Sequence, residues 1–294
     1  MPAVSKEPTA APDGRPLTIV VTGGRGQLGQ ALARRGAAHR MLCLGNDDLD
    51  ITRDTAVQTI ADLRPDLVIN AAALTDVDRC ETEVALAFAV NHEGARQAAL
   101  GAEAAGAALV QVSTDYVFDG RKGEPYVEDD APQPLSVYGA SKLAGEIVAR
   151  ELCSRSFVAR TAWLFGHGKD NFVRRVLARA KEQRHFRIVH SQVGSPTFCD
   201  DLADAILALG LTQAYGTYHL VNEGQCARDA FARAILRLGG VEGVEVEGVD
   251  DFPAAARRPT FAPLRNRAGA RLGIVLPPWE DALARYLAAD PAVP

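Results

Sequence analysis

The sequence predicts an α/β protein with a doubly wound parallel sheet and a smaller mixed lobe in its C-terminal part. Short apolar runs rich in β-branched residues alternate with helix-forming stretches through the first half of the chain. Such runs are typical of strands that are buried on both faces of a parallel sheet. Directly after the first run comes the pattern Gly23-x-x-Gly26-x-x-Gly29, which opens the first helix. Strand, glycine turn and helix in this order form the opening unit of such a sheet.

Composition excludes several classes of protein. The chain has 294 residues, of which 47% are hydrophobic, a size that suits one large domain or two coupled ones. The net charge of −5, without a basic stripe, argues against nucleic acid as a partner. No stretch approaches the roughly 18 apolar residues of a membrane span. The five cysteines are scattered, without a C-x-x-C pair, as expected of reduced thiols. We therefore expect a cytoplasmic protein that has no membrane contact.

The first part of the chain supplies the sheet. Residues 1–16 hold four prolines and no apolar signal segment, so we expect a disordered leader there. Strands are predicted over residues 17–21, 41–44, 67–70, 109–112 and 156–159. Helices are predicted over residues 30–35, 52–63, 81–105 and 137–152. This alternation outlines a six-stranded Rossmann-type sheet, to which a segment of about residues 198–224 returns.

The alternation loosens beyond Phe165. Helices are predicted over residues 171–182 and 200–209, and strands over 186–189 and 218–221. From residue 241 onward, repeated prolines predict short elements that wrap the smaller lobe. We therefore divide the chain into a sheet domain (17–166, with the returning segment) and a second lobe (167–197 and 225–294).

The glycine turn is the expected site of a dinucleotide. Glycines let backbone N–H groups approach a pyrophosphate, and the helix N-terminus favours an anion. The expected cofactor residues here are Gly23, Arg25, Gly26, Gln27, Leu28 and Gly29. The choice of dinucleotide stays open. Asp47, Asp48 and Asp50 follow the second strand, where an acid can hold the ribose diol of NADH, whereas Arg25 can pair with a 2′-phosphate. We favour NADPH slightly over NADH.

Tyr138 and Lys142 form the second candidate group. Their spacing of four residues places the phenol and the ammonium on one face of a helix. A nearby cation stabilises phenolate, so we expect the pKa of Tyr138 to be lowered, which suits proton transfer during hydride transfer to a carbonyl. The same pattern is also common on surface helices, and it gains weight here from the glycine turn.

Polar and small residues end two other strands. Ser113, Thr114 and Asp115 follow the apolar run at 109–112, at the sheet edge where α/β proteins bind ligands. A hydroxyl there can hydrogen-bond a substrate carbonyl, although the same residues also serve as caps of turns. Ala71, Ala72 and Ala73 follow Asn70, as expected where a flat cofactor passes close to the backbone, although packing alone also explains alanines.

These groups together resemble a known family. The order of the glycine turn, Asn70-Ala71-Ala72-Ala73, Thr114 and Tyr138/Lys142 is similar to that of the extended short-chain dehydrogenases/reductases. Within that superfamily the chain resembles the dTDP-4-dehydrorhamnose reductases from about residue 17 to residue 287. The further motifs that carry this resemblance are Leu49-Asp50-Ile51-Thr52, Ser113-Thr114-Asp115-Tyr116-Val117-Phe118-Asp119-Gly120, Tyr138-Gly139-x-Ser141-Lys142-x-x-Gly145-Glu146, Arg160-Thr161-x-Trp163 and Asn171-Phe172-Val173.

The resemblance implies an activity and roles for single residues. The reaction is NAD(P)H-dependent reduction of the C4 ketone of dTDP-4-dehydro-L-rhamnose to dTDP-L-rhamnose, a step in making cell-surface polysaccharide. Tyr138 would protonate the new alkoxide, Lys142 would hold the nicotinamide ribose, and Thr114 would hydrogen-bond the carbonyl. Asp115, Trp163 and Asn171 would contact the substrate, with the dTDP part on the second lobe. Asp50, Ile51 and the alanines 71–73 would contact the cofactor.

Some features stay open. The arginines of the helix at 171–182 (Arg174, Arg175, Arg179) can neutralise a diphosphate, although such a run is usually a solvated helix face. Some relatives dimerise through magnesium bound by an acid early in the first helix, where this chain has Gln30-Ala31-Leu32. We therefore predict no metal, and either a monomer or a homodimer. The alternative functions are reduction of another dTDP-4-keto-deoxysugar and a non-catalytic NADP-binding regulatory subunit.

Overall fold

A parallel six-stranded sheet forms the centre of the molecule. The computed structural model describes residues 15–289, so the predicted leader lies almost entirely outside the described residues. The strand order is β10-β5-β4-β3-β1-β2, and every neighbouring pair is parallel. The strands are β1 (Thr18–Thr22), β2 (Arg40–Leu44), β3 (Leu67–Asn70), β4 (Ala108–Thr114), β5 (Ser156–Thr161) and β10 (Gly216–His219). The predicted Rossmann-type fold is confirmed.

The chain direction reverses beside β1. It runs from β1 outward to β2, then crosses back over β1 to β3 and continues away through β4 and β5. In open α/β sheets, ligands bind outside the carboxyl ends of the strands at such a switch point. Here that edge carries Thr22 and Asn70, which share a hydrogen bond of 2.5 Å between Oγ1 and Oδ1.

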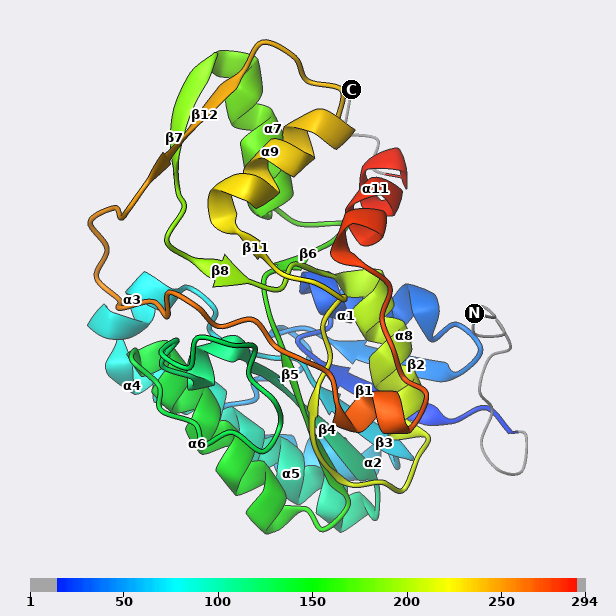
Figure 1. The fold of residues 1–294 in the computed structure, drawn as a ribbon. Helices are drawn as coiled ribbons and strands as arrows, with labels where there is room; N and C mark the ends of the chain where they lie inside the picture. The colour runs from blue at the N-terminus through cyan, green and yellow to red at the C-terminus, as the bar shows by residue number, and fades with distance from the viewer. Residues whose placement is uncertain (1–14, 290–294) are drawn as a thin grey trace.

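Helices cover both faces of the sheet (Figure 1). One face carries α1 (Gln27–Arg35) and α8 (Cys199–Gly210), and the other α2 (Thr55–Asp62), α5 (Gly94–Ala105) and α6 (Val137–Leu152). Alternate residues of a strand point to opposite faces, so Ile19 and Val21 pack with α1 and α8 whereas Val20 packs with α2 and α5. The uninterrupted apolar runs of the sequence therefore reflect burial on both faces.

The helix predicted over residues 81–105 is broken into several pieces. They are α3 (Val77–Thr82), α4 (Val84–Phe88), the π-helical turn η1 (Ala89–Glu93) and α5. In η1 the buried Asn91 exchanges two hydrogen bonds with the backbone of Leu74 and donates a third to Ser141 Oγ at 3.0 Å. A Cβ added to Gly145 of α6 would lie 2.3 Å from the Asn91 carbonyl oxygen. The wide turn thus brings a polar backbone segment against α6, and π-turns of this kind are frequent at functional sites.

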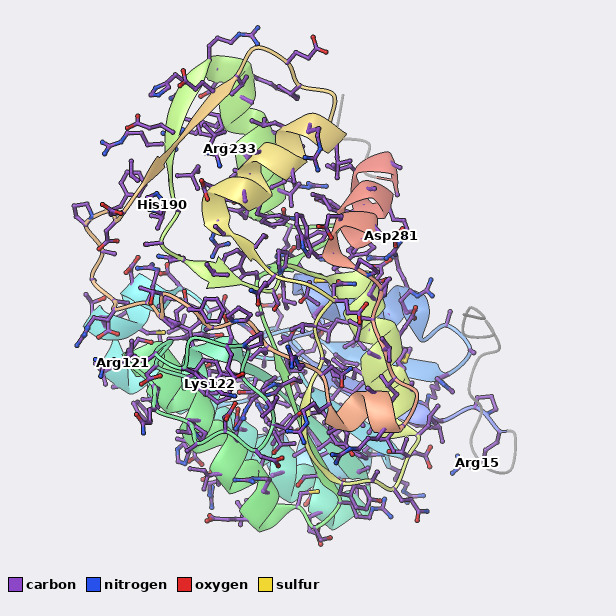
Figure 2. All side chains as sticks on the ribbon, in the orientation of Figure 1. Arg15, Arg121, Lys122, His190, Arg233 and Asp281 are labelled. Carbon is purple, nitrogen blue, oxygen red and sulfur yellow. The ribbon has the colours of Figure 1, made fainter. Side chains whose placement is uncertain are left out.

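The rest of the chain builds a smaller lobe with its own apolar core. Its main elements are α7 (Phe172–Glu182), β7 (His185–Val189), α9 (Arg228–Leu238), β12 (Glu245–Val249) and α11 (Trp279–Ala289). β7 and β12 pair in parallel. Figure 2 labels Arg233 on α9, which pairs with Asp229 at 2.6 Å. Neither α9 nor an element as long as α11 was predicted from the sequence.

Shorter elements complete the described chain. They are the 3₁₀ turn η2 (Asp115–Val117), the strand pairs β6 (Leu164–Phe165) with β9 (Thr197–Phe198) and β8 (Val193–Gly194) with β11 (Cys226–Ala227), and α10 (Ala268–Arg271). Across residues 15–289, we find no helix with both the length and the apolar character that crossing a bilayer requires.

Candidate functional site

The glycine turn forms a cradle at the end of β1. Gly23 has φ +68°, and a Cβ on it would lie 2.7 Å from the backbone nitrogen of Ala72. A Cβ on Gly29 would lie 2.5 Å from the carbonyl oxygen of Gly23. α1 begins at Gln27, and its N-cap Gly26 provides no side-chain cap. The first N–H groups of α1 are thus available to an anion, so the cradle fits a dinucleotide pyrophosphate. The structure also brings the predicted Ala71 and Ala72 against this turn.

Arg25 and the acids after β2 lie together. The guanidinium of Arg25 forms an ion pair with Asp47 and lies 3.6 Å from Asp48. All three side chains are largely exposed. Arg25, which favours NADPH, and Asp47 and Asp48, which favour NADH, thus lie together and partly neutralise each other.

Asp50 and Ile51 serve local structure in the described conformation. The Asp50 carboxylate accepts hydrogen bonds from Thr52 and Arg53, which hold its pKa below the usual range. The side chain of Ile51 is buried in the core between β1 and α5, and a Cβ on Gly94 would lie 2.9 Å from it. The contacts of Asp50 and Ile51 lie within the protein and do not by themselves indicate a ligand.

Tyr138 is positioned by the start of α6. Ser136 caps the helix by accepting a hydrogen bond from the backbone N–H of Gly139 at 3.2 Å. Gly139 allows close packing, since a Cβ there would lie 2.2 Å from the carbonyl oxygen of Tyr116. The ring of Tyr116 meets the ring of Tyr138 edge-on at 5.4 Å. The phenol is thereby held beside the end of β4, where Thr114 lies.

Thr114, Tyr138 and Lys142 lie where α6 packs on the end of β4, with a different electrostatic balance from the one expected. The Lys142 ammonium donates to the carbonyl oxygen of Val112 at 2.6 Å. Burial raises the pKa of Tyr138, and a side-chain hydrogen bond with Thr114 opposes part of this rise. Burial lowers the pKa of Lys142 to about 8, and the negative charge of Glu146 opposes part of this fall. The expected lowering of the Tyr138 pKa by Lys142 is therefore not seen in this structure, because burial dominates and Lys142 is not among the groups that shift this pKa. A neutral phenol is the form that donates a proton.

Asp115 faces the same site from the 3₁₀ turn. Thr114 Oγ1 donates to its carboxylate at 2.9 Å and also accepts from the backbone N–H of Tyr116 at 3.2 Å. The capping interpretation of these residues is therefore confirmed. Burial raises the pKa of Asp115 to about 7, and the positive charge of Arg228 acts in the opposite direction.

Trp163 and Asn171 lie where the chain passes from β5 to α7 of the smaller lobe. Trp163 has φ +46°, a strained conformation for a bulky side chain, and a Cβ on Gly194 would lie 2.4 Å from its indole ring. The amide of Asn171 caps α7 and also donates to Gly166 O at 2.9 Å and Gln27 Oε1 at 3.2 Å. Asn171 thus has a structural role that links α7 to the first residue of α1.

The arginines of α7 have contacts within the protein. Arg174 donates to the Tyr286 hydroxyl at 3.2 Å, and Arg179 donates to Gln183 at 3.2 Å. Arg175 lies 3.6 Å from Asp170 and is largely exposed. These contacts favour the interpretation of a solvated helix face over that of a diphosphate site.

Three charged residues near the site were not assigned a role from the sequence. Glu146 accepts from Ser113 Oγ and forms a bidentate ion pair with Arg160, buried behind Lys142. Glu146 and Arg160 both stand in motifs quoted from the sequence, but their pairing is visible only in the structure. Arg228, the first residue of α9, stacks on Trp163 and belongs to no motif that the sequence presents.

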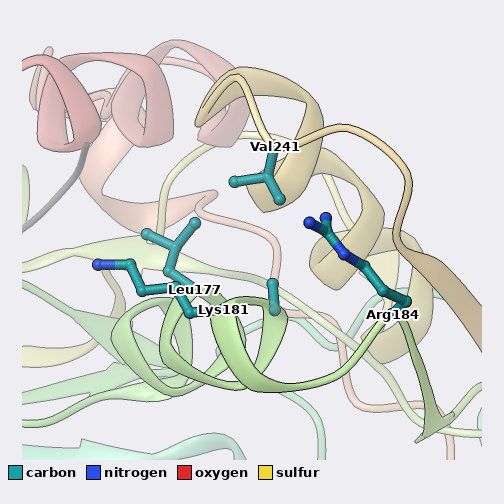
Figure 3. Close-up of a pocket in the computed structure, with 5 residues that line it drawn as sticks. Leu177, Lys181, Arg184 and Val241 are labelled. Carbon is teal, nitrogen blue, oxygen red and sulfur yellow. The ribbon is translucent and has the colours of Figure 1, made fainter.

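A surface cavity lies elsewhere, between α7 and the end of α9 (Figure 3). It has a volume of about 180 Å³, and its lining residues are Leu177, Ala180, Lys181, Arg184 and Val241. None of the predicted site residues lines it.

Comparisons with known proteins agree with this geometry. The family described as RmlD substrate binding domain matches residues 17–291. A dTDP-4-dehydrorhamnose reductase of Streptomyces griseus is 40% identical over 284 residues, covering 92% of this chain and 93% of the relative. The spore coat polysaccharide biosynthesis protein SpsK of Bacillus subtilis is 37% identical and covers 92% and 96%. The crystal structure of a Bacillus anthracis dTDP-4-dehydrorhamnose reductase in complex with NADP is 37% identical, has a TM-score of 0.90, and covers 94% and 100%.

Proposed function

The chain belongs to the RmlD substrate binding domain family, that of the dTDP-4-dehydrorhamnose reductases, and from this premise we propose its reaction and the roles of its residues. It is an NAD(P)-dependent oxidoreductase that reduces the C4 ketone of dTDP-4-dehydro-L-rhamnose to dTDP-L-rhamnose. The observation that carries the assignment is the grouping of Tyr138, Thr114 and Lys142 at the carboxyl end of β4, on the side of the sheet edge that the glycine cradle also faces.

The chain's own residues bind the ketone and deliver the proton. The reduced nicotinamide, when bound, supplies the hydride to C4. Thr114 turns its hydroxyl from the Asp115 carboxylate and donates a hydrogen bond to the C4 oxygen, and Tyr138 donates its phenolic proton as negative charge develops there. Lys142 holds the nicotinamide ribose and offsets the phenolate that remains. Asp115 and Trp163 orient the sugar, and Gly23, Gly26 and Gly29 hold the pyrophosphate.

The remaining assignments follow the same premise. NADPH is the preferred cofactor; Arg25 beside the glycine turn supports this, and the relative from B. anthracis was solved with NADP. Residues 17–166, with the returning segment at about 198–224, bind the cofactor, and 167–197 with 225–294 bind the nucleotide sugar. The protein is cytoplasmic, in line with its five free cysteines, and works as a monomer or homodimer.

The test is loss of NADPH absorbance on addition of dTDP-4-dehydro-L-rhamnose, with the product sugar identified. Tyr138→Phe should bind NADPH nearly as the wild type does and turn over at least about 100-fold more slowly, because general acid catalysis contributes about 10²- to 10⁴-fold. Tyr215→Phe removes an exposed phenol and should leave turnover unchanged. Equal activity of Tyr138→Phe and the wild type would refute the assigned acid.

Two other outcomes lead to different functions. Turnover of a different dTDP-4-keto-deoxysugar in preference would make the chain a sibling reductase, since side-chain placement decides sugar stereochemistry. NADPH binding without turnover of either sugar would indicate a regulatory subunit.

A further inference from the structure

We propose that Arg228, at the start of α9, binds the diphosphate of the nucleotide-sugar substrate. This proposal rests on the proposed function and adds a binding residue that belongs to none of the motifs described above.

The Arg228 guanidinium is held in one place by aromatic rings. Its central carbon lies 3.6 Å from the centroid of the Trp163 ring and 4.9 Å from that of Phe172. The backbone N–H of Arg228 donates to the carbonyl oxygen of Gln192 at 3.0 Å, which fixes the start of the side chain. Trp163 is itself held by its strained backbone and by close packing of its indole ring against Gly194, which has no side chain. A stacked guanidinium keeps its N–H edge free for hydrogen bonds in the plane of the group.

This cation has no anion of its own in the described chain. Within residues 15–289, no carboxylate lies within 4.0 Å of Arg228, and its side chain makes no hydrogen bond. Asp115 and Tyr116 are close enough to interact electrostatically, but the Asp115 carboxylate accepts from Thr114. Arg258, another cation beside Tyr116, is paired with Asp78 at 2.7 Å. A partly buried charge without a partner is costly, and a bound anion would remove that cost.

The position of Arg228 indicates that it binds the phosphates of the substrate rather than those of the cofactor. The cofactor pyrophosphate fits the glycine turn at the start of α1, whereas Arg228 lies on the smaller lobe against Trp163. The planar N–H fork of arginine matches two phosphate oxygens at once. A diphosphate at Arg228 would leave the attached sugar beside Trp163 and Asp115, near the phenol of Tyr138. The arginines of α7, by contrast, contact other parts of the protein.

The experiment measures binding of dTDP and of thymidine to the full chain by isothermal titration calorimetry. Arg228→Met keeps an apolar side chain on Trp163 and removes the charge. We expect it to weaken dTDP binding by about 10- to 100-fold, the range of a charge-assisted hydrogen bond, and to leave thymidine and NADPH binding within about twofold. Arg237→Met, an exposed arginine at the other end of α9, is the matched control and should change none of the three.

Each other result has a defined meaning. Unchanged dTDP affinity in Arg228→Met would overturn the proposal. An equal loss for dTDP and thymidine would overturn it too, because it would show that the side chain acts through packing on Trp163. Recovery of part of the dTDP affinity in Arg228→Lys, which restores the charge without the fork, would support it. If the wild-type chain bound neither dTDP nor thymidine, the proposed function itself would be refuted. Failure of the Arg228 proposal alone is different, because the wild type then still binds dTDP.

Discussion

The carboxyl group of Asp115 is buried beside the hydroxyl of Thr114, and its ionisation should be visible in the stability of the protein. Burial raises its pKa from the ordinary value of 3.8 to about 7. Between these values the native protein holds a proton that the unfolded chain has released. The stabilising contribution is therefore complete below about pH 4 and is lost as pH rises through about 7.

Replacing this acid should remove that pH dependence. From pH 5 to pH 8 the free energy of unfolding of the wild type should fall by about 2 to 3 kcal/mol relative to that of Asp115→Asn. Urea unfolding at the two pH values measures the difference. Asp129→Asn, at a highly exposed carboxylate, should run parallel to the wild type. Parallel curves for Asp115→Asn as well would show that the site stays hydrated enough to ionise normally.

At the scale of elements, an ion pair joins α6 to β5 one helical turn after Lys142. Glu146 and Arg160 are both almost completely buried and share two hydrogen bonds of 2.9 and 2.7 Å. Arg160 also lies over the Phe118 ring at 5.2 Å. Because Glu146 comes one turn after Lys142, the pair fixes the face of α6 that presents the lysine to β4.

Removing one partner of this pair should cost more than removing both. Glu146→Gln leaves a buried guanidinium without its anion and should lower the free energy of unfolding by about 3 to 5 kcal/mol. The double variant Glu146→Leu/Arg160→Met should recover most of that loss, because apolar groups of similar volume need no counter-ion. Ile147→Ala, at an exposed position of the same helix, is the control. Additive losses in the cycle formed by Glu146→Leu, Arg160→Met and their double variant would contradict this coupling.

Elements that depend on local signals are predicted from the sequence, whereas those that depend on distant contacts are not. The helix predicted over residues 137–152 matches α6, because a local signal, the cap at Ser136, starts it. The break of the helix predicted over 81–105 depends on contacts of Asn91 with Leu74 and with α6, which are distant in sequence. α11 follows two prolines. Prolines interrupt helices, so the sequence predicts only short elements in this region, but proline is well tolerated at a helix start. The partners of Arg25 and Arg228 likewise exist only in the folded chain.

Across the whole molecule, the path of the chain connects the two cores. It leaves the sheet after β5, builds α7 and β7, returns through β9 into α8, and leaves again after β10. Phe198 packs in the core of the smaller lobe, while the next residue, Cys199, packs against the sheet. Arg285 of α11 forms an ion pair with Asp201 of α8 at 2.7 Å. We therefore expect the sheet and the smaller lobe to unfold together.

The positions of the two tryptophans allow this coupling to be measured. Trp163 and Trp279 both pack with the core of the smaller lobe, whereas the proposed cofactor cradle lies at the end of β1. NADP⁺ at about 100 times its Kd should raise the free energy of unfolding by about 2.7 kcal/mol. If the two cores unfold as one unit, tryptophan fluorescence and far-UV circular dichroism should report the same urea midpoint and the same shift. A shift in circular dichroism that leaves the fluorescence transition in place would show instead that the smaller lobe unfolds by itself. The substrate would then bind to a lobe whose stability does not depend on the cofactor.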